Sequence, residues 1–115
     1  MDGKRAEEIA CQHLRSQGMQ VVARNWRWRG GEVDIIARDG PTVVFVEVKA
    51  RADDAHGTPE EAVTRGKRDR LWRTALAFLG GEPEVPVRFD VVAVGPHGLH
   101  HIRDAFREED VRPSP

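Results

Sequence analysis

Val43-Val44-Phe45-Val46-Glu47-Val48-Lys49, with Gly31-Glu32-Val33-Asp34-Ile35-Ile36 just before it, is the stretch that decides the fold. Both segments are rich in β-branched residues and are bounded by turn formers, which predicts two β-strands. The link Arg38-Asp39-Gly40-Pro41-Thr42 contains Asp-Gly, a strong signal for a short hairpin. We therefore expect the two strands to pair antiparallel, in the middle of a sheet that is covered on both sides.

Charged side chains interrupt this apolar run in a regular way. Because side chains alternate along a strand, Phe45, Glu47 and Lys49 share one face and the valines between them take the other. Antiparallel pairing brings Asp34 back to the Glu47 end of its neighbour. Carboxylates brought together on a covered face repel each other, and a hard divalent cation, most simply Mg²⁺, resolves the repulsion. This pair of strands is therefore a candidate metal site.

Length and composition indicate one globular domain. The chain has 115 residues, of which 39% are hydrophobic and 32% are charged. The single cysteine, Cys11, can form no internal disulfide, so a reduced, cytoplasmic setting is expected. The N-terminal residues run into acidic residues without an apolar segment, so we expect no signal peptide. No apolar stretch approaches the length of a membrane span, so no membrane association is expected.

The net charge of −1 argues against a nucleic-acid partner, but the distribution of charge argues for one. In one cluster arginines interleave with tryptophans, a pattern that suits phosphate contact combined with base stacking. This cluster comprises Arg24, Trp26, Arg27, Trp28 and Arg29. A second basic run, residues 65–73, includes Lys67, which could touch a phosphate. The plainer interpretation stays open, with the tryptophans on the core side of an edge strand and the charges in solvent.

Helical and strand periodicities predict an α/β domain with a mixed central sheet and flanking helices, in the order helix, three strands, helix, two strands. The helices are expected at residues 4–17 and 58–79, and the strands at residues 19–28, 31–36, 43–50, 87–94 and 99–103. Within the first strand, Val22 and Trp26 are expected on the same side. Thr58 and Pro59 have the pattern of a helix start, and Gly66 interrupts that helix. Residues 1–106 form the expected domain, and residues 107–115 a charged flexible tail.

The spacing of Asp34 and Glu47-Val48-Lys49 resembles the PD-(D/E)xK core shared by restriction endonucleases and archaeal Holliday junction resolvases. Nearly the whole chain is also similar to the YraN-type family, small bacterial proteins regarded as endonucleases. The matching stretches are Ala6–Ala10, Arg24–Arg27, Gly31–Ala37, Val44–Lys49, Gly57–Val63, Lys67, Arg88–Val92 and Ala105–Phe106. Ala6 stands where the family has a glycine, and His56 stands where it has an aromatic residue.

This resemblance implies a restriction-endonuclease-like fold and a metal-dependent cleavage of DNA, including branched or recombination intermediates. It implies that Asp34 and Glu47 hold Mg²⁺, or Mn²⁺ in its place, with the Val48 carbonyl as a third oxygen. Lys49 would orient or activate the attacking water and offset charge on the phosphate. Glu7, on the first helix, would complete the metal or water shell. A homodimer is suggested by the same resemblance, because junction-cutting relatives work as dimers.

Two other functions stay open at this point. The first is a non-catalytic nucleic-acid-binding protein of the nuclease fold, acting in a repair or recombination complex. The second is a role on an uncharged substrate, in which the carboxylates are structural. Glu47 and Lys49 could form a salt bridge on a solvated face, and Glu7 could be a charge favoured by the helix dipole.

The remaining candidate residues favour packing over chemistry. Trp72 is expected in the core, and Cys11 is expected to pack on the helix stripe. The histidines at positions 56, 97, 100 and 101 fit no closed zinc pattern, because Cys11 is the only thiol. We therefore expect no zinc site.

Overall fold

Five strands form one sheet in the order in which they occur in the chain, and the structure, a computed structural model, describes residues 2–52 and 64–106. The elements are α1 (Gly3–Ser16), β1 (Gln20–Trp28), β2 (Gly31–Asp39), β3 (Thr42–Ala50), α2 (Arg65–Leu79), β4 (Val87–Gly95) and β5 (Gly98–Phe106). Neighbouring strands are antiparallel except β3 and β4, which run parallel. The predicted order of elements and the mixed sheet are confirmed. No helix in the described part of the chain is long and apolar enough to cross a membrane.

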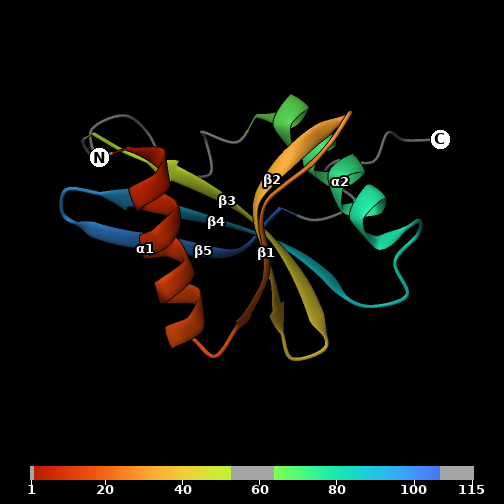
Figure 1. Cartoon of the computed structure of the whole chain (residues 1–115), viewed down its shortest axis with the longest axis horizontal. Helices are drawn as coiled ribbons and strands as arrows, with labels where there is room; N and C mark the ends of the chain where they lie inside the picture. The colour runs from red at the N-terminus through yellow and green to blue at the C-terminus, as the bar shows by residue number, and fades with distance from the viewer. Residues whose placement is uncertain (1, 53–63, 107–115) are drawn as a thin grey trace.

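The two helices cover opposite faces of the sheet (Figure 1). On one face Ala10 and Leu14 of α1 pack over Val44 and Val46 of β3. On the other face α2 packs over Phe45, the residue between Val44 and Val46 in the sequence. The alternation predicted for β3 is confirmed, because Val44 and Val46 pack on one face and Phe45 on the other, and all three are buried, as expected for a central strand that is covered on both faces. Glu47 and Lys49 then belong to the α2 face.

The turns that the sequence predicted are present. Asp39 pairs with Thr42, so a two-residue turn joins β2 to β3, and Gly40 adopts a φ of 60° there. Gly18, with a φ of 86°, ends α1 and lets the Met19 amide donate to the Leu14 carbonyl, at 3.0 Å. These two turns fix where β1 and β3 begin.

The start of α2 differs from the prediction. Thr64 has extended backbone dihedrals and its hydroxyl oxygen accepts from the Lys67 amide at 3.3 Å, so it is the N-cap of a helix that begins at Arg65. The single helix expected over residues 58–79 is therefore wrong, and Gly66 lies in the first turn of α2. The predicted helix start at Thr58 and Pro59 lies outside the described residues.

The strand β1 also differs from the prediction, because its side chains do not alternate regularly. Its register with β2 shifts between Val21 and Ala23, and Asn25 has a positive φ of 51°. These irregularities change the face that each side chain takes. Val22 is 46% exposed, whereas Trp26 packs against α2, so the two do not share a side.

The strand β5 is longer than the five residues expected. A register shift opposite Phe89 and Val91, with Asp104 at a φ of 55°, carries the chain on to Phe106. The Phe106 ring stacks on that of Phe89, with ring centroids 4.8 Å apart. The bulge explains why the periodicity after residue 103 no longer looked like a strand.

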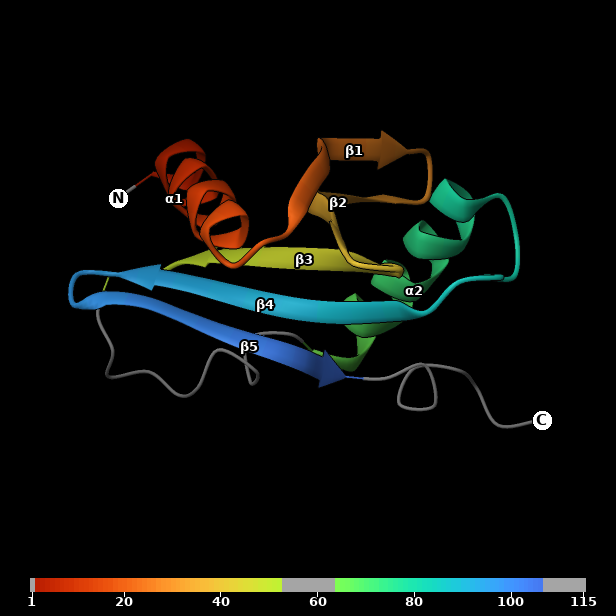
Figure 2. The same ribbon diagram turned by 90° about the horizontal axis from the view of Figure 1, so that it is seen from below.

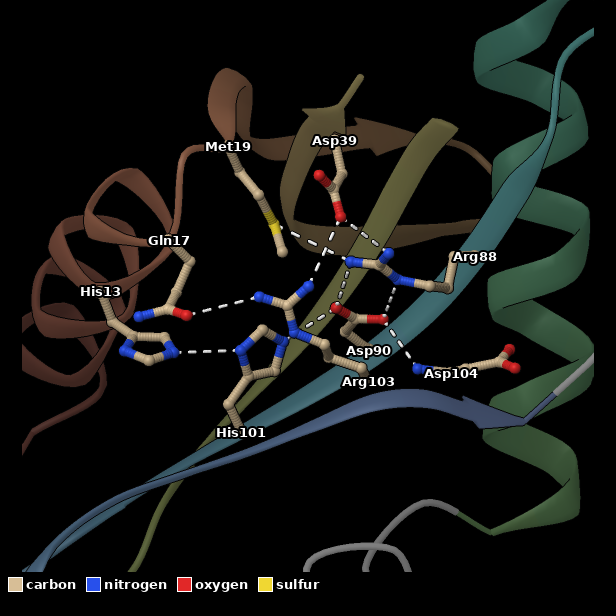
Figure 3. A network of polar contacts seen from close by, with 9 residues as sticks. All are labelled: His13, Gln17, Met19, Asp39, Arg88, Asp90, His101, Arg103 and Asp104. Carbon is tan, nitrogen blue, oxygen red and sulfur yellow. Dashed lines mark hydrogen bonds and ion pairs between the residues drawn. The ribbon is translucent and has the colours of Figure 1, made fainter. Parts of the chain in front are cut away.

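A buried carboxylate, Asp90, closes this bulge on the α1 face of the sheet (Figure 3). It accepts from Arg88 Nε at 2.9 Å, from the Asp104 amide at 3.0 Å and from His101 Nε2 at 2.8 Å. Arg88 also donates to Asp39 at 2.9 Å. Burial acts to raise the pKa of Asp90, but the hydrogen bonds from His101 and Arg88 outweigh it and lower that pKa.

The same network holds the C-terminal half of α1. His13 Nε2 and His101 Nδ1 lie 3.0 Å apart, and Arg103 donates to Gln17 at 3.4 Å. Burial lowers the pKa of His13, and the neighbouring His101 and Arg103 lower it further. The polar contacts of Asp90 thus link β4 and β5 to α1 through the imidazole rings of His101 and His13.

We expect Asp90→Ala to lower the free energy of unfolding by about 3–5 kcal/mol, because it leaves the Arg88 guanidinium buried without its main partner. Urea unfolding at pH 7 measures this. Because the pKa of Asp90 is lowered in the folded chain, its stabilisation is complete above the carboxyl's ordinary pKa of about 3.9 and is lost as the pH falls below it. The control Arg27→Ala removes an exposed ion pair and should cost less than about 1 kcal/mol. Equal effects of the two variants would contradict the prediction.

Candidate active site

The strands β2 and β3 separate at the residue that the sequence singled out. Their hydrogen-bonded ladder ends at the pair Ile35 and Val46, and Asp34 is the first residue of β2 beyond the end of the ladder. The Val48 amide then donates to Asp34 Oδ2 at 2.7 Å, so a carboxylate oxygen takes the place of a backbone carbonyl. Figure 2 shows β1 and β2 rising away from β3 beside the last turns of α2. The opening in the sheet is therefore built around Asp34.

Glu47 and Lys49 extend from β3 toward this opening, on the α2 face. Lys49 Nζ lies 3.2 Å from Glu47 Oε1, and the two side chains are only 21% and 19% exposed. The predicted salt bridge is present, but it lies in a mostly buried position and not on a solvated face. One oxygen of Glu47 and one of Asp34 are engaged in these contacts, and within residues 2–52 and 64–106 the second oxygen of each has no hydrogen bond or ion pair.

The charge of Glu47 affects the ionisation of Asp34. Burial, followed by the negative charge of Glu47, raises the pKa of Asp34 to about 7, although the Val48 amide opposes the shift. Glu7 and Glu32 raise it further. A carboxyl with this pKa marks a partly buried place where several negative charges meet, which is typical of functional sites.

Glu7 brings a third carboxylate to the site from the opposite face of the sheet. It lies on α1, and its charge reaches Asp34 where the two strands separate. Its Oε1 atom is buried and has no hydrogen-bond partner among the described residues. The neighbouring Glu8 is 48% exposed and pairs with Arg24 at 2.9 Å, as expected for a residue that faces solvent. A buried carboxylate oxygen normally has a partner, and a bound cation or an ordered water would be a suitable partner for Glu7 Oε1.

A cavity of about 220 Å³ adjoins the two strand carboxylates. Asp34, Glu47 and Glu32 provide its acidic wall, and Lys67 and Arg70 of α2 provide its basic wall. The sequence interpretation identified Lys67 but not the roles of Glu32 and Arg70. Arg70 lies three positions after Lys67, a helical spacing that places both on one face and could have revealed it.

The donor set fits Mg²⁺ better than a metal that is fully enclosed by protein ligands. Among residues 2–52 and 64–106, no group of three or more His, Cys, Asp or Glu side chains is arranged to hold a metal ion. Mg²⁺ needs only one or two carboxylates, because waters and substrate phosphates complete its shell. Asp34 and Glu47 are such a pair, and the unpartnered oxygen of Glu7 could accept from a metal-bound water. A zinc site has no support in this part of the chain.

The position of Val48 refines one prediction. The structure brings Val48 to the site through its N–H group, which donates to Asp34. Metal ligation by the Val48 carbonyl stays a prediction. The Val48 N–H group holds the Asp34 side chain in place.

The two tryptophans of β1 pack against α2. The Trp26 ring meets the Phe78 ring edge to face, with centroids 5.3 Å apart. Trp28 Nε1 donates to Thr74 Oγ1 at 2.9 Å. These contacts fasten the β1–β2 hairpin to α2, which matches the packing role that the sequence left open for Trp26.

The three arginines near these tryptophans, Arg24, Arg27 and Arg29, lie on the outer surface. Arg24 pairs with Glu8, and Arg27 pairs with Glu32 at 2.9 Å, where both side chains are more than half exposed. Arg29 is exposed. Because Glu32 also lines the cavity, Arg27 lies close to its rim. Nucleic-acid contact by these three arginines stays a prediction.

The packing predictions for the other candidates are confirmed. Cys11 is fully buried, and burial raises the pKa of its thiol, so it is poorly suited to act as a nucleophile. Trp72 is 6% exposed and lies in the α2 core. His101 is committed to the Asp90 network. That network was missed at the sequence level, although Arg88 and Asp90 alternate in an otherwise apolar strand.

Comparison with known proteins places the chain among relatives of similar size. The profile of the uncharacterised protein family UPF0102 matches residues 6–94, which include all the acidic residues of the site. A UPF0102 protein of Halorhodospira halophila is 50% identical over 107 residues, 93% of this chain and 88% of the relative. One from Nocardia farcinica is 53% identical over 94 residues, covering 80% of this chain and 74% of the relative. One from Symbiobacterium thermophilum is 52% identical over 97 residues, covering 82% of this chain and 81% of the relative.

We expect Asp34→Asn to stabilise the metal-free protein at pH 8. The folded chain keeps the Asp34 proton up to a pH of about 7, whereas an unfolded carboxyl releases it near pH 4. Stability therefore falls as the pH rises from about 4 to 7. Asparagine carries no proton to lose, so it removes this pH-dependent loss of stability. Its side-chain oxygen can still accept a hydrogen bond from the Val48 amide. Urea unfolding with chelator present should show a gain of about 1–3 kcal/mol at pH 8 and little difference at pH 4.

Glu32→Gln is the matched control, because Glu32 lies on the same cavity wall but is more than half exposed. It should change stability by less than about 0.5 kcal/mol at either pH. If Asp34→Asn were destabilising at pH 8, the electrostatic conflict inferred at the site would be absent.

Proposed function

We propose that this protein, which belongs to the uncharacterised protein family UPF0102, is a metal-dependent nuclease that hydrolyses phosphodiester bonds in DNA. The observation that carries the proposal is the opening between β2 and β3. There, partly buried carboxylates that repel each other face the basic side chains of α2 across one cavity. Acidic groups suited to a divalent cation and basic groups suited to a phosphate are the two halves of a phosphodiesterase site.

Asp34 and Glu47 would hold the metal ion, each through its oxygen that is not already engaged. Glu7 would complete the water shell, because its unpartnered oxygen would accept from a metal-bound water. When bound, Mg²⁺ would polarise the phosphate and lower the pKa of a coordinated water. The protein's own contribution is to fix these donors. Val48 orients Asp34 and Lys49 orients Glu47, through the contacts at 2.7 and 3.2 Å.

The balance of charge supports a phosphate substrate. Four carboxylates reach the site, and one of them, Glu32, is paired with Arg27. The other three, Asp34, Glu47 and Glu7, are matched in number by the cationic groups Lys49, Lys67 and Arg70. A divalent cation would leave this region positive and ready for an anionic ligand. An uncharged substrate would gain little from such a site, which makes that alternative the weakest.

The choice of DNA rests on the resemblance to PD-(D/E)xK nucleases. Asp34, Glu47 and Lys49 carry the motif, and they occupy adjacent strands of a mixed sheet with a helix on each face. The same resemblance suggests branched or recombination intermediates as substrates, Mn²⁺ as a substitute metal, and a homodimer acting in the cytoplasm.

A non-catalytic nucleic-acid-binding protein is the second candidate. It is favoured by the contacts that Asp34 and Glu47 already make, because an acid bonded to Val48 or Lys49 can serve the fold alone. Against it, the fold has no evident need for the unpartnered oxygen of Glu7 or for a carboxyl whose pKa is raised to about 7.

We expect the purified protein to cut DNA with Mg²⁺ or Mn²⁺ and not with chelator. Branched, nicked and single-stranded DNA, analysed on denaturing gels, would reveal the products. Asp34→Ala and Glu47→Ala should each lower the rate at least about a hundredfold, because several kcal/mol of charge stabilisation are lost with the metal. Binding without products under any condition, unchanged in both variants, would instead support the non-catalytic alternative.

Glu7→Gln tests the third carboxylate separately. It keeps the side chain's shape but removes its charge, so the Mg²⁺ concentration needed for half-maximal cleavage should rise about tenfold. Glu8→Gln is its neighbour on the solvent side of α1 and should leave that concentration unchanged. A Glu7 variant that needs no more metal than the wild type would remove Glu7 from the site.

A further inference from the structure

The lysine that the sequence motif assigns to catalysis does not line the cavity. Among the described residues, the basic side chains on the cavity wall are Lys67 and Arg70, both from α2, and Lys49 is not one of them. We propose that Lys67, rather than Lys49, is the ammonium group that contacts the substrate phosphate. This inference rests on the proposed function and assigns the phosphate contact within it.

Lys49 already has a partner. Its Nζ lies 3.2 Å from Glu47 Oε1, and about four-fifths of each side chain is buried. An ion pair screened this well from water is costly to break, so Lys49 is held on the carboxylate side of the site. A phosphate oxygen would have to compete with Glu47 for it. Lys49 therefore fits the description of a positioning residue, which orients Glu47.

Lys67 is placed differently. It lies in the first turn of α2, where the Thr64 side chain accepts from its backbone amide at 3.3 Å and fixes its position. Its side chain interacts with that of Lys49. Among residues 2–52 and 64–106, no carboxylate lies within ion-pair distance of Lys67.

Two ammonium groups that meet in this way repel each other, and an anion between or beside them removes the repulsion. The contact with Lys49 lowers the pKa of Lys67, which is the mark of that unrelieved repulsion. Lys49 is neutralised by Glu47, so the unsatisfied charge is that of Lys67. The positive end of the α2 dipole adds to the attraction for an anion at this end of the cavity. A phosphate oxygen is the ligand that completes the arrangement.

Metal-free binding of DNA separates the two lysines without any cleavage. Each phosphate that a protein neutralises adds about 0.9 to the slope of log affinity against log salt concentration. With chelator present, Lys67→Met should reduce that slope by about one, and Lys49→Met should leave it unchanged. Arg15→Met is the control, because Arg15 is exposed in the last turn of α1 on the other face of the sheet, and it should also leave the slope unchanged. An unchanged slope in Lys67→Met, or a reduced one in Lys49→Met, would overturn the inference.

Cleavage of a substrate with a neutral methylphosphonate at the scissile position tests the contact itself. On normal DNA, Lys67→Met should lower the single-turnover rate about a hundredfold. On the methylphosphonate the partner charge is gone, so the variant should come within about threefold of the wild type. A Lys67 defect of the same size on both substrates would show that the lysine acts elsewhere.

The two hypotheses fail in different ways. If the wild type binds DNA but cuts none, the proposed function fails, while the salt slopes still decide the role of Lys67. If the wild type cuts DNA and Lys67→Met behaves like it, the inference fails and the nuclease stands. If the wild type neither binds nor cuts, both are overturned.

Discussion

The hydrogen bond from the Val48 amide to the Asp34 carboxylate is the contact on which the site depends. A sheet cannot open between two central strands without leaving backbone groups unpaired, and a buried unpaired amide is costly. Here one side chain satisfies that amide at 2.7 Å as the ladder ends. At this opening the charge of Glu7 acts on Asp34 from the α1 face, and Lys67 and Arg70 of α2 line the cavity beside Asp34 on the other face. Without the separation of β2 from β3, these groups would lie on opposite faces of the sheet.

Two aspartates illustrate how the surroundings decide the role of one residue type. Asp90 is buried on the α1 face, yet cations and N–H donors surround it and its pKa is lowered. Burial raises the pKa of Asp34, and the negative charge of Glu47 raises it further, to about 7. The first is a satisfied group that stabilises the fold. The second is an unsatisfied group, and such groups occur where a protein has a ligand to bind.

The turn end of the β1–β2 hairpin shows the same division between stability and function. Trp26 and Trp28 hold the hairpin against Phe78 and Thr74 of α2, which gives the cavity a fixed wall. Glu32, on the next strand, lines that cavity. Both tryptophans pack against α2 and are only partly buried, so base stacking on their exposed parts stays a prediction. The charged residues beside them are the part of the hairpin that stays accessible.

The sequence by itself determined the order of the elements, the alternation of β3 and the meeting of Asp34 with Glu47. These follow from local rules, namely side-chain period, turn chemistry and the short Asp-Gly link between two strands. It could not determine the face of Trp26, the length of β5 or the buried network of Asp90, because a register shift or one residue with a positive φ changes what every later residue contacts. Nor could it rank Lys49 against Lys67. Which ammonium group faces the cavity depends on how α2 is placed against the sheet, and packing between distant parts of the chain decides that.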